Sequence, residues 1–154
     1  MKVQVINSGQ YLWKKTIAFS ETCSWISGTQ LAERMQSNSF ADWERVIIAT
    51  DEDNVVGFCV FEGKGIVPPE YDFSPFINLV FVDEPYRGKR ISELMIRYAL
   101  DYAKEIGFKE VYLKSEHHGL YEKYGFEKIA DFEPIHGPAN QLFRIVIWMK
   151  HSSL

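Results

Sequence analysis

A turn rich in positive charge precedes the longest predicted helix. It has the sequence DEPYRGKRIS, residues 83–92, and carries Arg87, Lys89 and Arg90. A helix begins at its positive end, where each cation costs about 0.3–1 kcal/mol unless an anion offsets it. The first N–H groups of the helix have no intrahelical partner, and together with the helix dipole they bind anions. The turn therefore predicts a phosphate site, at which Gly88 lets a ligand approach the backbone.

The alternative is a solvated surface turn whose cations pair with Asp83, Glu84 and Glu93. For an isolated RGKR tetrapeptide that alternative is the better one, but here the turn joins a buried strand to a long helix. Two common phosphate-binding motifs are excluded. The sequence contains neither the P-loop pattern G-x-x-x-x-G-K-[ST] nor the dinucleotide pattern G-x-G-x-x-G.

The helix after the turn is predicted from about Lys89 to Ile106, and Gly107 ends it as a C-terminal cap. On its outer face Glu93 and Arg97 are four residues apart and can pair. The apolar residues at helical spacing, expected to face the core, are Ile91, Leu94, Met95, Tyr98, Tyr102 and Ile106.

Two further helices are predicted near the N-terminus, over Gln10–Phe19 and Thr29–Gln36, with Ser27 and Gln30 as a capping box for the second. Residues 62–75 form a loop marked by Gly and Pro, and a short helix lies in GLYEKY before Gly125. The predicted strands are KVQVI, RVIIAT, VVGFCVF, FINLVFV, EVYLKS, FEKIA and LFRIVIWMK. The order βααβββαβαββ predicts a mixed sheet in one domain covering residues 1–154, with a parallel pair around the long helix.

Composition limits the class of protein. The chain has 154 residues, 46% hydrophobic and 25% charged, with a net charge of −4, which argues against a general nucleic-acid binder. No apolar run approaches the roughly 18 residues that a membrane-spanning helix needs, and the N-terminal MKVQVINSGQ lacks the apolar core of a signal peptide. With only Cys23 and Cys59 there is no disulfide framework, so we expect a cytoplasmic protein that binds neither membranes nor nucleic acids.

The segments VFVDEPYRGKRISELMI and GLYEKYGFEKI together resemble the GNAT superfamily of N-acetyltransferases. The resemblance spans the chain in element order and is sharpest from Leu79 to Ile129. It implies an α/β fold with a central, mostly antiparallel mixed sheet of about six to seven strands flanked by helices. It further implies direct transfer of an acetyl group from acetyl-CoA to a primary amine in a ternary complex, with no metal.

The family's pyrophosphate turn has the pattern [Arg/Gln]-x-x-Gly-x-[Gly/Ala]. Arg87 matches the first position, whereas Arg90 and Ser92 replace the two small residues. The resemblance also implies that the strand ending in Val82 contacts the cofactor through its backbone, with the N–H of Val82 or Phe81 binding the oxyanion; these residues can equally be core residues. The implied cofactor-binding residues are Val80, Phe81, Val82, Arg87, Gly88, Lys89, Arg90, Ile91 and Ser92.

Acetyl transfer to an amine also needs an acid and a base. The tyrosine in the family's LYEKxGF pattern points at the departing sulfur, which makes Tyr121 the implied general acid; without the resemblance it reads as a core aromatic. A lysine-like amine has a pKa near ~10.4 and must lose a proton before it attacks. His117 or Glu116, just after a strand, is the candidate base, and exposure to solvent is the alternative for each.

Several alternatives stay open. The pair His117 and His118 suggests a metal-dependent protein, but its spacing matches no common metal motif. Cys59, in an apolar strand, lacks a base that would make it a nucleophile. Replacement of the small turn residues allows a catalytically inactive CoA-binding regulatory or structural domain. The acceptor is a small-molecule amine or a protein amino group, and a homodimer through the C-terminal strands is a further expectation from the resemblance. The carboxylates that either line an acidic acceptor pocket or are solvated are Glu62, Glu70, Asp72 and Glu116.

Overall fold

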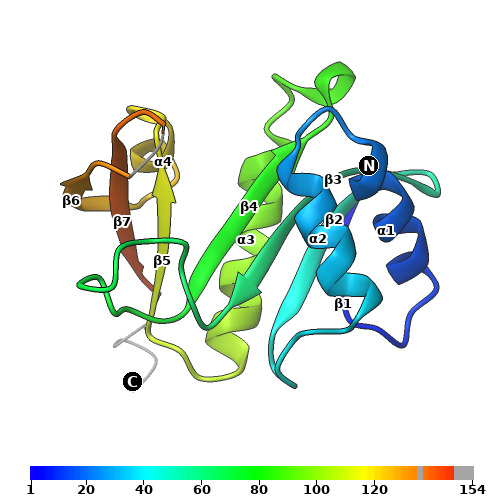
Figure 1. Ribbon diagram of the computed structural model, residues 1–154, viewed down its shortest axis with the longest axis horizontal. Helices are drawn as coiled ribbons and strands as arrows, with labels where there is room; N and C mark the ends of the chain where they lie inside the picture. The colour runs from blue at the N-terminus through cyan, green and yellow to red at the C-terminus, as the bar shows by residue number, and fades with distance from the viewer. Residues whose placement is uncertain (135–136, 148–154) are drawn as a thin grey trace, which may run out of the picture.

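The computed structural model describes residues 1–134 and 137–147, and these form a seven-stranded sheet flanked by helices (Figure 1). The strand order is β1-β2-β3-β4-β5-β7-β6, and every neighbouring pair is antiparallel except β4 and β5. The predicted mixed, mostly antiparallel sheet is therefore confirmed. The strands are β1 (Lys2–Ile6), β2 (Arg45–Asp51), β3 (Asn54–Glu62), β4 (Phe76–Val82), β5 (Glu110–Ser115), β6 (Glu127–Phe132) and β7 (Asn140–Val146).

Helices cover both faces of the sheet. The helices are α1 (Leu12–Thr22), α2 (Ser27–Gln36), α3 (Ile91–Glu105) and α4 (Leu120–Lys123), with a 3₁₀ turn, η1 (Glu84–Tyr86). Alternate strand residues pack on opposite faces: Ile47 and Ile77 contact the α3 side, whereas Ile48 and Phe81 contact α1 and α2. In Figure 1 the blue and cyan helices α1 and α2 lie in front of the sheet and the green α3 lies behind it. Within the described residues no helix combines the length and the apolar character needed to cross a membrane.

Strands β4 and β5 pair only briefly and then separate. Their one aligned pair is Phe76 and Tyr112, at the start of β4. Beyond it the two strands diverge (Figure 1). Leu79 has a φ of 55°, in the left-handed region, and the pairing of β4 with β3 shifts register at this point. Such a bulge bends a strand locally, and here it accompanies the opening between β4 and β5.

The face that α3 buries differs from the predicted stripe. Ile91 and Met95 are buried as expected, but Leu94, Tyr98 and Ile106 are about two-fifths exposed. Glu93, predicted on the outer face, is buried and binds both Arg90 and Arg97. The error has a physical cause: small side chains let the helix approach the sheet closely. The buried positions that the stripe omitted are Ile96, Ala99 and Ala103.

Two smaller expectations also changed. The predicted capping box at Ser27 is wrong, because helix α2 begins after Ile26 and no side chain caps it. Gly107 and Gly125 do follow α3 and α4 with positive φ, as C-terminal caps require. The last predicted strand is confirmed as far as Val146, and its final residues, from 148, lie outside the described residues.

Candidate active site

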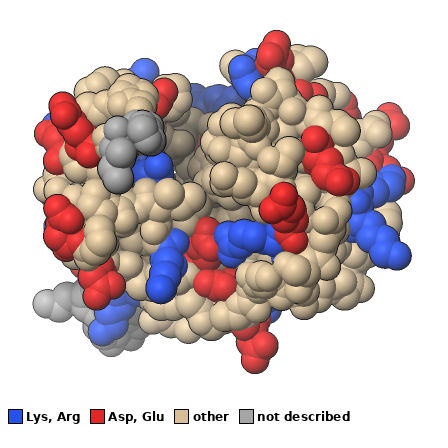
Figure 2. Space-filling view, in the orientation of Figure 1, with Lys and Arg blue, Asp and Glu red and all other residues tan. Residues whose placement is uncertain are grey.

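A cavity of about 810 Å³ occupies the opening between β4 and β5. Its wall includes Trp25 and Gln30 from the α1–α2 side, and Leu120 and Tyr121 from α4 on the other side. The opening thus passes through the layer of the sheet, and Figure 2 shows a hollow between two lobes. A ligand that enters this first cavity from one face of the sheet can therefore contact a second ligand that enters from the other face. Transfer of a group between two substrates requires such contact.

A second cavity of about 360 Å³ lies against the charged turn at the start of α3. Both cavities share the same connecting residues: Val82, Arg87, Ser92 and Leu120. The phosphate-binding turn predicted from the sequence therefore adjoins the cavity that contains Tyr121. The remaining residues that line the second cavity are Tyr86, Gly88, Arg90, Ile91 and Tyr124.

Specific contacts hold the three cations of the turn. Arg87 donates from Nε to the Val82 carbonyl at 2.8 Å. Arg90 bonds Glu93 at 2.7 Å, and this bond lowers the pKa of the Glu93 carboxyl and raises that of Arg90. Lys89 lies over the Tyr86 ring, with its Nζ 5.5 Å from the ring centroid, and lines neither cavity. The buried acid in the first turn of α3 thus offsets the positive charge that the sequence places there.

Two residues of the turn have left-handed backbone conformations. Gly88 has a φ of 79°, and a Cβ added there would meet open space. Arg90, where the family has glycine, has a φ of 63° and is the residue immediately before α3. A non-glycine residue is strained in this region. Arg90 thus has a left-handed conformation that glycine adopts without strain.

The backbone of β4 directs the N–H and C=O groups of Val82 toward the opening. The Asp83 N–H donates to the Val56 carbonyl on β3 at 2.8 Å. Because backbone groups alternate in direction along a strand, Val82 points its N–H and C=O away from β3. The Arg87 bond to the Val82 carbonyl is made from that side. Phe81, opposite Phe58 in the same register, points its amide toward β3 instead.

Tyr121 lies in the wall of the first cavity and is 5% exposed. Its ring contacts Tyr124 and Phe126 edge-on and lies 5.8 Å from the ring of Phe143. Burial raises the pKa of the Tyr121 phenol well above its ordinary value. The hydroxyl therefore stays protonated at neutral pH, which is the state that a proton donor needs.

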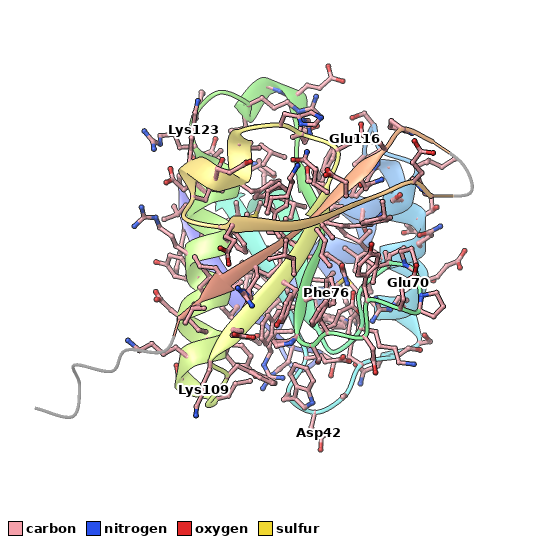
Figure 3. The ribbon with its side chains drawn as sticks, turned by 90° about the vertical axis from the view of Figure 1, so that its left-hand side faces the viewer. Asp42, Glu70, Phe76, Lys109, Glu116 and Lys123 are labelled. Carbon is pink, nitrogen blue, oxygen red and sulfur yellow. The ribbon has the colours of Figure 1, made fainter. Side chains whose placement is uncertain are left out.

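Glu116 and His117 also line the first cavity, and both side chains are exposed. The backbone of His117 is fixed: its N–H donates to Ser115 Oγ, and its carbonyl accepts from Gln141 Nε2. Figure 3 shows Glu116 just past the upper end of β5. Both candidate bases therefore lie beside the opening.

An acidic acceptor pocket does not form. Glu70 and Asp72 are exposed on the loop before β4 and line neither cavity, and Figure 3 shows Glu70 well below Glu116. Glu62 is buried and bonded to Arg34 at 2.8 Å. Of the four carboxylates considered from the sequence, Glu116 alone lines the cavity. That hypothesis was wrong because a loop can carry acidic residues away from a site as easily as toward it.

Two other kinds of chemistry find little support. Burial raises the pKa of the Cys59 thiol strongly, so the thiol stays protonated and unreactive at neutral pH. Among residues 1–134 and 137–147, no cluster of three or more His, Cys, Asp or Glu side chains could hold a metal ion.

The cavity residues that the sequence analysis missed include Trp25, Asn78 and Lys114. Trp25 stacks on Phe81 with ring centroids 5.8 Å apart, and nothing in its surroundings in the sequence separates it from a core tryptophan. Asn78 did carry a signal, because it is the one polar residue in the apolar run FINLVFV.

Comparisons with known proteins agree with this geometry. A family model described as acetyltransferase (GNAT) domain matches residues 42–128. No curated protein sequence matches the chain. Among solved structures, the aminoglycoside 6'-N-acetyltransferase from Enterococcus faecium is 16% identical, with a TM-score of 0.73 over 97% of this chain and 99% of that chain.

Two similar structures were solved with coenzyme A. An aminoglycoside 6'-N-acetyltransferase complexed with coenzyme A is 15% identical, with a TM-score of 0.70 over 97% of this chain and 99% of that one. The GNAT family N-acetyltransferase YhbS from Escherichia coli, in complex with CoA, is 20% identical, with a TM-score of 0.66 over 93% of this chain and 80% of that one. These structures confirm the fold. The chain belongs to the GNAT acetyltransferase family and is an acyltransferase.

Proposed function

We propose that this protein transfers an acetyl group from acetyl-CoA to a primary amine, by direct attack of the amine in a ternary complex. One observation carries the proposal: the cavity at the charged turn and the cavity containing Tyr121 share Val82, Arg87, Ser92 and Leu120. A ligand with phosphates at the turn can therefore extend its thioester to Tyr121, while an amine enters from the α1–α2 side. The described residues, 1–134 and 137–147, form one fold around a single sheet, which supports a single catalytic domain.

The turn fits the pyrophosphate of CoA. Arg87 and Arg90 supply positive charge at the edge of the second cavity, and Gly88 and Ile91 supply backbone there. The N–H groups at the start of α3 lack intrahelical partners and point along the helix axis. Lys89 lines neither cavity, so it contributes charge from a distance. A Cβ added at Gly88 would meet no other atom, so the space beside this residue is open to a ligand.

The amine must be neutral when it attacks the thioester carbon. Either His117 or Glu116, directly or through water, accepts one proton from the ammonium group before the attack; a second proton leaves the nitrogen for the same base or for water once the C–N bond has formed. Negative charge then builds on the carbonyl oxygen, where preorganised donors lower the barrier. The sequence analysis considered the N–H groups of Val82 and Phe81 as donors to this oxyanion. Strand alternation favours Val82, because its N–H faces the opening whereas that of Phe81 faces β3.

Collapse of the tetrahedral intermediate breaks the C–S bond and releases CoA as a thiolate. Tyr121 is the buried hydroxyl in this part of the cavity, and it donates a hydrogen bond or a proton to the sulfur. Reference pKa values are about 10 for a phenol and about 8.5 for a thiol. Full transfer is thus slightly uphill from those values, and hydrogen bonding to the developing charge matters as much as transfer.

A CoA-binding regulatory or structural domain without turnover is the second candidate. It is favoured by Arg90 and Ser92, which replace the small residues of the family's turn. CoA release is the deciding measurement, made with aminoglycosides, polyamines, α-amino acids and a lysine-containing peptide. We expect turnover with at least one class. CoA binding with no turnover on any amine would overturn the enzymatic proposal in favour of the second candidate.

A further inference from the structure

Two polar side chains line the cavity close to the point at which β4 and β5 separate. Phe76 and Tyr112 form the one aligned pair, and their ring centroids are 5.8 Å apart. Two residues further along each strand, and hence on the same face, stand Asn78 and Lys114. Both line the first cavity. A polar site thus forms where the opening begins, on the face away from α3.

The orientation of the Asn78 carboxamide is fixed by its neighbours. Nδ2 donates to Glu62 Oε2 at 2.7 Å and to the Lys64 carbonyl at 2.8 Å. Both partners only accept hydrogen bonds, so a flipped amide would place Oδ1 against two other oxygens. Oδ1 is therefore held on the opposite edge. It is buried and has no hydrogen-bond donor among the described residues, so an N–H group of a ligand that reaches it would satisfy it.

Lys114 is the cation at this site. Its side chain is half-buried, and within the described residues it makes no ion pair. Burial lowers the pKa of its ammonium group, and Glu116 partly opposes that shift. A half-buried cation without a fixed partner gains most from an anion supplied by a ligand.

The formal charges of the cavity wall balance. Glu84 and Arg87 stand at the CoA end, and Lys114 and Glu116 at the acceptor end. The nearby Glu62 is neutralised by Arg34 and faces away into the protein. The rest of the acceptor wall is uncharged: Ser24, Trp25, Ser27, Gln30 and Ile66. Among the described residues, a polycation would find one carboxylate there, Glu116, and it would also meet the cation Lys114.

We propose that the acceptor is an α-amino acid or a similar primary amine with an anionic group next to the nitrogen. An N–H of the amine donates to Asn78 Oδ1, and the anionic group pairs with Lys114. Trp25 and Ile66 provide an apolar surface for the side chain. This assignment rests on the proposed acetyl transfer and narrows its acceptor.

The test compares amino acids with their decarboxylated counterparts. The probes are phenylalanine with 2-phenylethylamine and methionine with 3-(methylthio)propylamine, and spermidine represents polycations. For the wild type we expect kcat/KM to be about tenfold to one-hundred-fold higher for the amino acid of each pair, the range for a hydrogen bond to a charged group. Lys114→Met should abolish this ratio, and Lys114→Glu should reverse it. A ratio between two substrates is insensitive to any loss of folded protein.

Asn78→Ala tests the amine contact. It should lower kcat/KM about tenfold or more for both members of a pair, because both carry the N–H, while the Kd for CoA stays unchanged. Tyr102→Phe is the matched control: it deletes a hydroxyl that donates to the Trp43 carbonyl at 2.7 Å, remote from the cavity, and should alter neither ratio nor KM.

The outcomes separate the two proposals. Equal rates within each pair, a preference for spermidine, or an unchanged ratio in Lys114→Met overturns the amino-acid assignment and leaves acetyl transfer standing. An unchanged kcat/KM in folded Asn78→Ala overturns the Asn78 contact. Failure of every amine with intact CoA binding overturns acetyl transfer and this inference together.

Discussion

The Ser92 Oγ and Tyr124 hydroxyl oxygens lie 3.0 Å apart and form a hydrogen bond. Ser92 is in the first turn of α3, and Tyr124 directly follows α4. The bond therefore ties the turn proposed to bind phosphate to the short helix that carries Tyr121. Tyr124 is part of the second cavity, so replacing it is expected to change CoA binding, and it is unsuitable as a neutral comparison for Tyr121.

Tyr121→Phe should lower kcat while leaving CoA affinity and melting temperature close to wild type. The change keeps the buried ring and removes only the hydroxyl proposed to bond the leaving sulfur. General acid assistance is typically worth about 10²–10⁴-fold, so the fall in kcat should lie in or somewhat below that range. Steady-state kinetics with CoA titration measures both effects. Tyr102→Phe serves as the hydroxyl-deletion control, and equal small effects in the two variants would make Tyr121 a core residue.

The same substitution should alter stability at alkaline pH. Burial raises the folded-state pKa of Tyr121 above its ordinary value of 10.0. Below pH 10 the phenol is protonated in both the folded and the unfolded chain, and its contribution to the free energy of unfolding is fully present. As the pH rises above it, the unfolded chain ionises first, so stability falls until the folded-state pKa is passed. Urea unfolding from about pH 9 to 11 should show a shallower decline in Tyr121→Phe than in wild type; parallel curves would contradict this.

Arg90→Gly should be more stable than Arg90→Ala by about 1 kcal/mol. Both variants lose the bond to Glu93, so they differ only in how well they tolerate a φ of 63°. Denaturant unfolding of the two proteins isolates this backbone effect. If alanine proved equally stable, the left-handed conformation would not be present in solution.

CoA binding should weaken as salt rises, because the turn matches phosphate charge. Arg87→Met removes one cation and should raise the Kd for CoA about tenfold to one-hundred-fold at low salt, with a shallower salt dependence. Calorimetric titration at several salt concentrations measures both.

Gly88→Val should impair CoA binding with little effect on folding. A valine strains a backbone at φ 79° and places its Cβ in the open space of the turn. Unchanged CoA affinity in a folded Gly88→Val protein would argue against phosphate binding here. Lys89→Met is the comparison within the same turn, since Lys89 lines neither cavity, and its effect should be smaller than that of Arg87→Met.

His117→Ala should lower kcat and change the acidic limb of the pH–rate profile, with little change in CoA affinity. Histidine ordinarily titrates between about pH 5 and 8, which matches the removal of a proton from an amine. The rate is measured from pH 5 to 9 for this variant and for Glu116→Gln. A wild-type profile in His117→Ala, with a reduced rate in Glu116→Gln, would assign the proton to Glu116.

Much of this fold could be predicted from the sequence, because its signals are local. Apolar runs ended by Gly, Pro or acidic clusters specify the hairpin of β2 and β3 and the buried β4, because the signals act between neighbouring residues. The same holds for the turn at Arg87–Ser92, whereas Tyr121 was singled out only by the resemblance of GLYEKYGF to the GNAT family. Both cavities contain residues from these segments.

Only the tertiary structure decided which residues share the proposed acceptor site. Asn78 faces Glu62 and the Lys64 carbonyl, and Lys114 comes from another strand; these contacts depend on strand register and on the separation of β4 from β5. The buried face of α3 was likewise set by packing, since Glu93 is buried while Leu94 is two-fifths exposed. A linear pattern records periodicity along one element. It carries no information about the distance or rotation between elements, because these are fixed by the packing of side chains far apart in the chain.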